Sequence, residues 1–190
     1  MTSILRIDSS IKGDASITRR LTAKITDHLG GDVSVRDTTK LPLIDGDWIG
    51  AAYTPADQRS EAQKEQLALS DALIAELKAA DTLVIGMPLY NFGVTGPLKA
   101  WIDMICRVGE TFRYTESGPE GLVAPKRVFI AYAAGGVPHG SGFDHASGYL
   151  RQVLGFIGLT DLTFVAAEGV AVDEAVAIAK AEEQIAGLAA

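Results

Sequence analysis

The sequence has 190 residues, of which 47% are hydrophobic and 22% are charged, and its formal net charge is −7. A chain of this length fits one domain, here residues 1–190, and buries enough surface to fold without a metal ion or a disulfide. The negative charge disfavours nucleic acid and anionic membranes as partners, because both require a dense basic face.

Strand and helix signals alternate along the chain, with short apolar runs predicting strands and amphipathic or capped runs predicting helices. The predicted strands are Ile4–Ile7, Val33–Arg36, Thr82–Gly86, Val128–Ala133 and Leu162–Val165. The predicted helices are Ile17–Leu29, Glu61–Ala80, Pro97–Val108, Ala146–Ile157 and Asp173–Leu188. This alternation predicts an α/β fold with a doubly wound, five-stranded parallel sheet and helices on both faces.

Two stretches interrupt the alternation. Asp37–Ser60 is predicted to be a long connection, and such loops often serve function or an interface. Its expected packing residues are Leu43, Ile44, Trp48 and Ile49. Arg113–Leu122 is polar and rich in glycine, and we expect it to be an excursion before the fourth strand.

The loop after the first strand carries four hydroxyl side chains at the start of a helix. It has neither the glycine pattern of a dinucleotide fold nor the Gly-Lys-Ser/Thr of a P-loop. A terminal phosphate could accept hydrogen bonds there from Ser10, Ser16 and Thr18 and from free backbone N–H groups. The alternative is that Ser16 or Thr18 only caps the helix, and on this loop alone capping is the stronger interpretation.

The loop after the third strand carries Tyr90, Asn91 and Phe92. In a sheet of strand order 2-1-3-4-5 this loop faces the first one across a crevice. Its aromatic pair suits a shelf for a flat ring system, and the glycine pair Gly135–Gly136 after the fourth strand would allow close approach from the other side. We therefore expect a flavin. The alternative is that the two aromatic side chains only close the edge of the sheet.

Several motifs together resemble those of the FMN-dependent NADH-azoreductases, also described as FMN-dependent NADH:quinone oxidoreductases. They are SSI followed by S-x-T, MPLYNFGVTGPLKAWID, RVGETFRYTESGPEGL, AGG and LGFIGLTDLTFVAAEG. The resemblance extends over nearly the whole chain. It implies a flavodoxin-like fold and a homodimer that binds one FMN per subunit, with each active site completed by the other chain.

The resemblance also implies which residues bind the cofactor. Those for the FMN phosphate are Ser10, Ser16, Ile17 and Thr18, and those for the isoalloxazine ring are Leu89, Tyr90, Asn91 and Phe92. A further contact segment, commonly Ser-Arg-Gly-Gly in the family, corresponds to Ala133, Ala134, Gly135 and Gly136. Only the glycines match. Side-chain bonds from this segment to the pyrimidine edge of the flavin are therefore lost, and we expect the flavin potential or affinity to differ.

The reaction implied by the resemblance passes two electrons from NADH through bound FMN to quinones or aromatic azo compounds. Because one pocket serves both partners in turn, a ping-pong mechanism is expected. Asn91 and His139 are the implied catalytic residues, with His139 as a donor to charge that develops on the acceptor. Tyr114 and Phe156 are implied walls of the substrate pocket. The alternatives are a core position for Phe156, a solvent-exposed loop position for His139 and an interface position for Tyr114.

A rival hypothesis is a flavodoxin-type electron carrier that binds FMN but has no reductase activity on small molecules, and another keeps the fold but binds FAD. The long insertions favour a substrate pocket over the carrier. The one cysteine, Cys106, excludes an internal disulfide, and its apolar helical setting predicts a buried, unreactive thiol. We expect no metal site. The absence of a signal peptide and of a long apolar segment predicts a cytoplasmic location.

Overall fold

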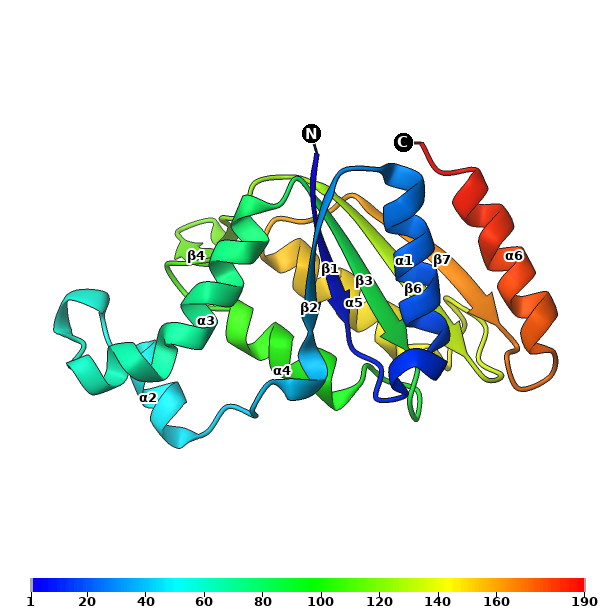
Figure 1. Ribbon diagram of the computed structural model, residues 1–190. Coiled ribbons are helices and arrows are strands. Elements are labelled where there is room, and N and C mark those ends of the chain that lie inside the picture. Colours follow the sequence, from blue (N-terminus) through cyan, green and yellow to red (C-terminus); the bar gives the residue numbers. More distant parts are fainter. Residues whose placement is uncertain (1, 190) are drawn as a thin grey trace.

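The computed structural model describes residues 2–189 and contains a five-stranded parallel sheet of order β2-β1-β3-β6-β7 (Figure 1). Its strands are β1 (Ser3–Asp8), β2 (Asp32–Asp37), β3 (Thr82–Pro88), β6 (Arg127–Ala134) and β7 (Leu162–Glu168). All five predicted strands are present in the predicted order. The order reverses between β1 and β3, so the loops that follow these two strands lie at the switch point where α/β proteins bind ligands.

Helices cover both faces of the sheet. On one face lie α1 (Ile17–Leu29) and α6 (Glu174–Ala186), and on the other lie α3 (Glu61–Ala79), α4 (Gly96–Ile105) and α5 (His145–Phe156) (Figure 1). Each face has its own apolar cluster. The central strand β3 contributes Leu83 and Ile85 to one cluster and Val84 to the other. A strand buried on both faces must be apolar throughout, which explains its unbroken hydrophobic run.

The prediction for Asp37–Ser60 was incomplete, because this connection contains a helix, α2 (Gly46–Tyr53). Short 3-10 turns, Thr38–Lys40 and Ala56–Gln58, flank it. Asp45 caps α2 by accepting a 2.8 Å hydrogen bond from the backbone N–H of Trp48. Helix α2 packs against α3, beside the end of α3 that is farther from the sheet (Figure 1).

Only part of the predicted packing in this connection is correct. Trp48 is buried and Ile44 packs against the same apolar cluster, as expected. Leu43 is 78% exposed and Ile49 is also exposed, so these two predictions are wrong. Trp48 takes the buried position on α2, and the neighbouring Ile49 lines an open cavity instead.

The excursion predicted at Arg113–Leu122 is present, and it forms an antiparallel hairpin of β4 (Phe112–Thr115) and β5 (Gly118–Gly121). Preceding it, α4 ends at Ile105 rather than at Val108. The chain turns there because the hydroxyl of Thr111 donates a 2.6 Å hydrogen bond to the carbonyl of Ile105, one of the carbonyls that a longer helix would use. Within residues 2–189, no helix combines the length and the apolar character needed to cross a membrane.

Cys106 follows α4 directly and is partly buried. Burial, with a smaller effect of Asp103, raises the pKa of its thiol to about 12. A thiol with this pKa is almost entirely protonated at pH 8, and only the thiolate is a good nucleophile. We expect iodoacetamide to modify Cys106 in the folded protein roughly a hundredfold more slowly than in guanidinium-unfolded protein. Mass spectrometry follows the modification. Comparable modification rates in the folded and the unfolded protein would contradict the prediction of an unreactive thiol.

Candidate functional site

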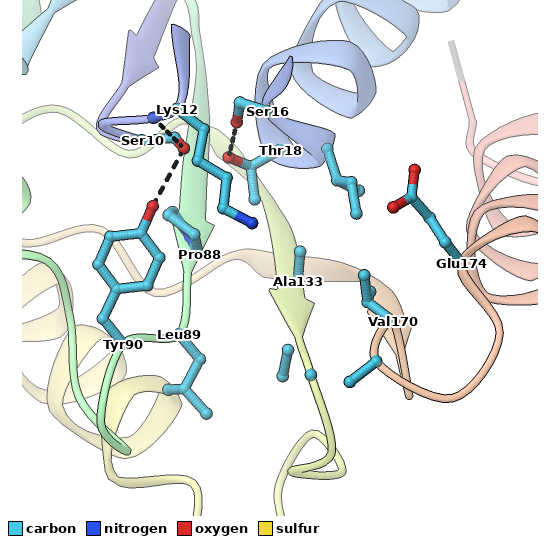
Figure 2. Close-up of a pocket in the computed structure, with 14 residues that line it drawn as sticks. Ser10, Lys12, Ser16, Thr18, Pro88, Leu89, Tyr90, Ala133, Val170 and Glu174 are labelled. Carbon is cyan, nitrogen blue, oxygen red and sulfur yellow. Dashed lines mark hydrogen bonds between the residues drawn. The ribbon is translucent and has the colours of Figure 1, made fainter.

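The carboxyl ends of β1, β3, β6 and β7 surround a cavity of about 320 Å³ (Figure 2). It is lined by Ser10, Lys12, Ser16, Ile17, Thr18, Pro88, Leu89, Tyr90, Ala133, Ala134, Gly135, Val170, Ala171 and Glu174. Hydroxyl groups gather at one end, by the start of α1, and Leu89 lies at the other, while the Tyr90 side chain reaches from near Leu89 toward Ser10 (Figure 2). The cavity therefore joins a polar end to a largely apolar one.

The polar end is built on the first turn of α1. The side chains of Ser10, Ser16 and Thr18 are each 1% exposed. Ser16 is the N-cap, since its Oγ accepts a 3.2 Å hydrogen bond from the N–H of Arg19, and the same Oγ lies 3.1 Å from Thr18 Oγ1. The capping interpretation is thus correct for Ser16. It does not exclude anion binding, because a hydroxyl that accepts one hydrogen bond can still donate another.

Hydrogen bonds hold the loops after β1 and β3 against each other. The hydroxyl of Ser9 donates to the carbonyl of Gly86 at 2.7 Å, and the hydroxyl of Thr95 donates to the carbonyl of Ser9 at 3.2 Å. Closer to the cavity, Ser10 Oγ and Tyr90 OH are 3.3 Å apart (Figure 2). The polar end and the aromatic side chain are therefore positioned relative to each other before any ligand binds.

Asn91 and Phe92 form a tight turn. Tyr90 and Gly93 exchange both backbone hydrogen bonds, at 3.2 and 3.1 Å, and the two residues between them have φ values of 49° and 70°. Positive φ at both central positions is typical of a type I′ turn, in which the second position usually holds glycine. The carbonyl of Phe92 is fixed by a 3.2 Å bond from the N–H of His145. Positive φ strains the backbone of residues other than glycine. This strain persists only where the surrounding structure maintains it, and it is common in ligand-binding loops.

The opposite wall is formed by backbone and methyl groups. The N–H of Val170 donates to the carbonyl of Ala134 at 3.1 Å, and the N–H of Ala171 donates to the carbonyl of Gly135 at 3.0 Å. These bonds attach the loop after β7 to the loop after β6. Since alanine side chains carry no polar group, this wall offers a ligand no side-chain hydrogen bond from positions 133 and 134.

The structure brings most of the expected cofactor residues together around this cavity. They are Ser10, Ser16, Ile17, Thr18, Leu89, Tyr90, Ala133, Ala134 and Gly135. Asn91 and Phe92 lie on the adjoining turn, and Gly136 follows Gly135 and lines a different cavity. Lining residues that were not predicted are Lys12, Pro88, Val170, Ala171 and Glu174. The position of Val170 and Ala171 just after the fifth strand was the available signal for them.

His139 does not line this first cavity. It lines a separate cavity of about 520 Å³ with Gly136 and Glu168. Its N–H donates a 2.6 Å hydrogen bond to Glu168 Oε1, and its ring lies 4.4 Å from that of Phe164 and 5.4 Å from that of Tyr132. His139 is partly buried rather than free in solvent. Its role as a donor to an electron acceptor stays a prediction.

Tyr114 and Phe156 are also remote from the first cavity but share an aromatic cluster. The ring of Phe112 lies 5.7 Å from that of Tyr114 and 4.5 Å from that of Phe156. Tyr114 is 71% exposed. Together with residues of α2 and α4 it lines a second, mainly apolar cavity of about 440 Å³. Residues 2–189 contain no group of three or more His, Cys, Asp or Glu side chains placed to bind a metal ion.

Comparison with known proteins agrees with this architecture. The profile of a family described as having a flavodoxin-like fold matches residues 2–188. The chain is 57% identical over 100% of both sequences to FMN-dependent NADH:quinone oxidoreductase 1 of Jannaschia sp. (strain CCS1). It is 50% identical to the protein of the same name from Hahella chejuensis, over 98% of this chain and 94% of that one. Among solved structures, the azoreductase of Bacillus anthracis str. Sterne superposes with a TM-score of 0.85 at 26% identity, over 98% of each chain.

Proposed function

Because the chain belongs to the flavodoxin-like family of FMN-dependent NADH:quinone oxidoreductases, we propose that it transfers two electrons from NADH through bound FMN to quinones and aromatic azo compounds. It is an oxidoreductase, with FMN as its cofactor and NADH as its electron donor. The observation that carries the proposal is the cavity of about 320 Å³, whose two ends differ in chemistry as the two ends of FMN do.

The residues around this cavity fit FMN. Ser10, Ser16 and Thr18 supply hydroxyl donors at the amino end of a helix, which is a favourable place for a phosphate. Leu89 and Tyr90 supply a shelf for the ring system. When bound, FMN supplies the two-electron chemistry that links a nicotinamide to a quinone or an azo group.

The protein's contribution is to bind and orient. The strained turn at Asn91 and Phe92 is held in one conformation by the Tyr90–Gly93 bridge, so its backbone groups are available to the polar edge of the ring without reorganisation. We assign Asn91 to this orienting role. On the other side, Ala133 and Ala134 leave recognition to backbone groups, and we expect the flavin potential or affinity to differ from that of relatives with Ser-Arg at these positions.

Steady-state kinetics with the purified protein test the proposal. We expect rapid NADH oxidation when menadione or methyl red is the acceptor, with parallel double-reciprocal lines when both substrates are varied. Parallel lines are the pattern of a ping-pong reaction, in which NAD leaves before the acceptor binds. Bound FMN that NADH cannot reduce would refute the enzyme and support the electron carrier instead. Heat release of the flavin and chromatography distinguish FMN from FAD.

We further propose a homodimer in which the second, apolar cavity is covered by another copy of the chain. The supporting observation is that several side chains lining it are large, apolar or aromatic, and exposed. They are Ile49, Tyr53, Val108 and Tyr114. Apolar side chains gathered in this way are typical of a surface that binds a partner, and a two-fold dimer is the commonest assembly. Tyr114 would then reach toward the substrate pocket of the partner subunit, supported from behind by Phe112 and Phe156.

Tyr114→Ala tests this arrangement. We expect it to raise the KM for the quinone by roughly tenfold and to shift the monomer–dimer equilibrium toward monomer, because it removes a large aromatic contact. Val176→Ala is the control, since Val176 is also exposed but lies on α6, which packs on the other face of the sheet. Sedimentation velocity and acceptor kinetics measure the two effects. An unchanged dimer and an unchanged KM would contradict the assignment.

A further inference from the structure

A lysine extends into the cavity at its polar end. Lys12 immediately precedes the 3-10 turn Gly13–Ala15, and its backbone N–H donates a 3.3 Å hydrogen bond to Ser10 Oγ. Its side chain runs from the first loop past Thr18, and its ammonium group points into the open space of the cavity (Figure 2). The hydroxyl loop therefore includes a full positive charge.

The charges around Lys12 leave its ammonium group without an acidic partner. None of the ion pairs formed within residues 2–189 involves Lys12. Among the described residues that line the cavity, Glu174 is the one acidic residue, and its carboxylate pairs with Arg20 Nη1 at 3.7 Å rather than with Lys12. The polar end of the cavity thus combines one cation, three buried hydroxyls and the amino end of a helix.

This combination selects a doubly charged phosphate monoester over an uncharged alcohol. A hydroxyl or a helix amino end interacts favourably with any acceptor, whereas an ammonium group is favourable mainly for an anion. The chain as a whole has a net charge of −7 and repels anions at long range. A local cation at the binding site offsets that repulsion.

We propose that Lys12 is the counter-ion of the FMN phosphate and makes the protein select FMN over riboflavin. The inference rests on the proposed function, because it takes FMN as the cofactor. Lys12 is a binding residue in this scheme and takes no part in electron transfer. It adds a positive charge to the hydroxyl and backbone donors that the sequence predicts for the phosphate.

The test compares two flavins that differ only in the phosphate. Full-length protein is dialysed to equilibrium against graded FMN or riboflavin, and bound flavin per subunit is measured by absorbance. For Lys12→Met we expect FMN binding to weaken by about tenfold at low salt, or about 1.4 kcal/mol. Riboflavin binding should not change. Salt screens the attraction between the ammonium group and the phosphate. The difference in FMN affinity between Lys12→Met and wild type should therefore shrink as the salt concentration rises.

Two further variants separate charge from other effects. Lys12→Arg keeps the positive charge and should retain most of the FMN affinity. Lys24→Met removes the same charge from the surface of α1, where Lys24 pairs with Glu182 at 2.6 Å, and should leave FMN affinity within about twofold. Circular dichroism checks that each variant is folded.

The possible outcomes are distinct. Equal FMN affinity of Lys12→Met and wild type would overturn the role of Lys12, because the charge would then be solvated and irrelevant. Equal weakening for FMN and riboflavin would overturn it as well, since the lysine would then act on the shape of the cavity rather than on the phosphate. Failure of the wild-type protein to bind FMN at all would refute the proposed function, and the role of Lys12 with it.

Discussion

Replacing both hydroxyls at the start of α1, by Ser16→Ala together with Thr18→Ala, should weaken FMN binding by roughly a hundredfold or more. Each hydrogen bond to a charged group contributes about 1.5–3 kcal/mol, and the variant removes two such donors from a buried site. Ser16 and Thr18 are buried residues and their hydroxyl oxygens lie 3.1 Å apart, so water cannot easily replace them as donors to the same anion. Flavin per subunit after gel filtration measures the loss.

This variant needs a control for stability, because Ser16 also caps α1. Losing an N-cap costs about 1 kcal/mol of folding free energy. Ser60→Ala is the matched control, since Ser60 caps α3 through a capping box and lies outside the cavity. We expect Ser60→Ala to lower the free energy of unfolding by a similar amount while flavin occupancy stays normal. Unchanged flavin occupancy in the double variant, with native circular dichroism, would refute the phosphate assignment.

Gly121→Ala should displace the β4–β5 hairpin and lower quinone reductase activity by at least about tenfold, with FMN still bound. A Cβ atom at position 121 would lie 2.2 Å from the backbone nitrogen of Gly158 and 2.3 Å from the carbonyl carbon of Ile157. Neither backbone atom can move independently, because the N–H of Val123 donates a 3.0 Å bond to the carbonyl of Ile157. Overpacking of this kind costs about 1–3 kcal/mol.

The expected loss of activity follows from the residues that the hairpin carries. Phe112 and Tyr114 belong to β4, which pairs with β5 at Gly121, so a shift of Gly121 moves the aromatic cluster. Gly155→Ala is the control, because it lies in α5 close to the same contact but its Cβ would meet nothing within 4 Å. That change should be neutral or stabilising by about 0.5–1 kcal/mol. Wild-type activity and thermal stability of Gly121→Ala would contradict the argument.

Local patterns were sufficient to predict the sheet and most of the helices. The unbroken apolar run of β3 is required by burial on both faces, and that requirement is visible in the residues themselves. Ser16 and Ser60 mark the starts of two helices by capping, which depends on residues only three positions apart. The strands β4 and β5 were missed because each has only four residues, most of them exposed, and so shows no apolar run, and α2 was missed because it has only eight residues.

The sequence also predicted part of the candidate site. Ser10, Ser16, Thr18 and Tyr90 were identified because they follow strands that meet at the switch point, and the structure places them around one cavity. Tyr114, Phe156 and His139 were assigned to the site through motif resemblance, and in the single chain they lie around other cavities or clusters. A motif records which residues occur together in a family, but not the distances between their side chains.

The amino-acid sequence by itself determined the strand order, the positions of the hydroxyls at the start of α1 and the aromatic turn, because these depend on short-range patterns and on one topological rule. Only the tertiary structure decided that the loop after β7 forms a wall of the cavity and that Lys12 points into it. It also decided that the hairpin packs against the chain just after α5, through the close backbone approach of Gly121 to Ile157 and Gly158. These features depend on contacts between segments that are far apart in the sequence, and no local pattern of residues specifies such contacts.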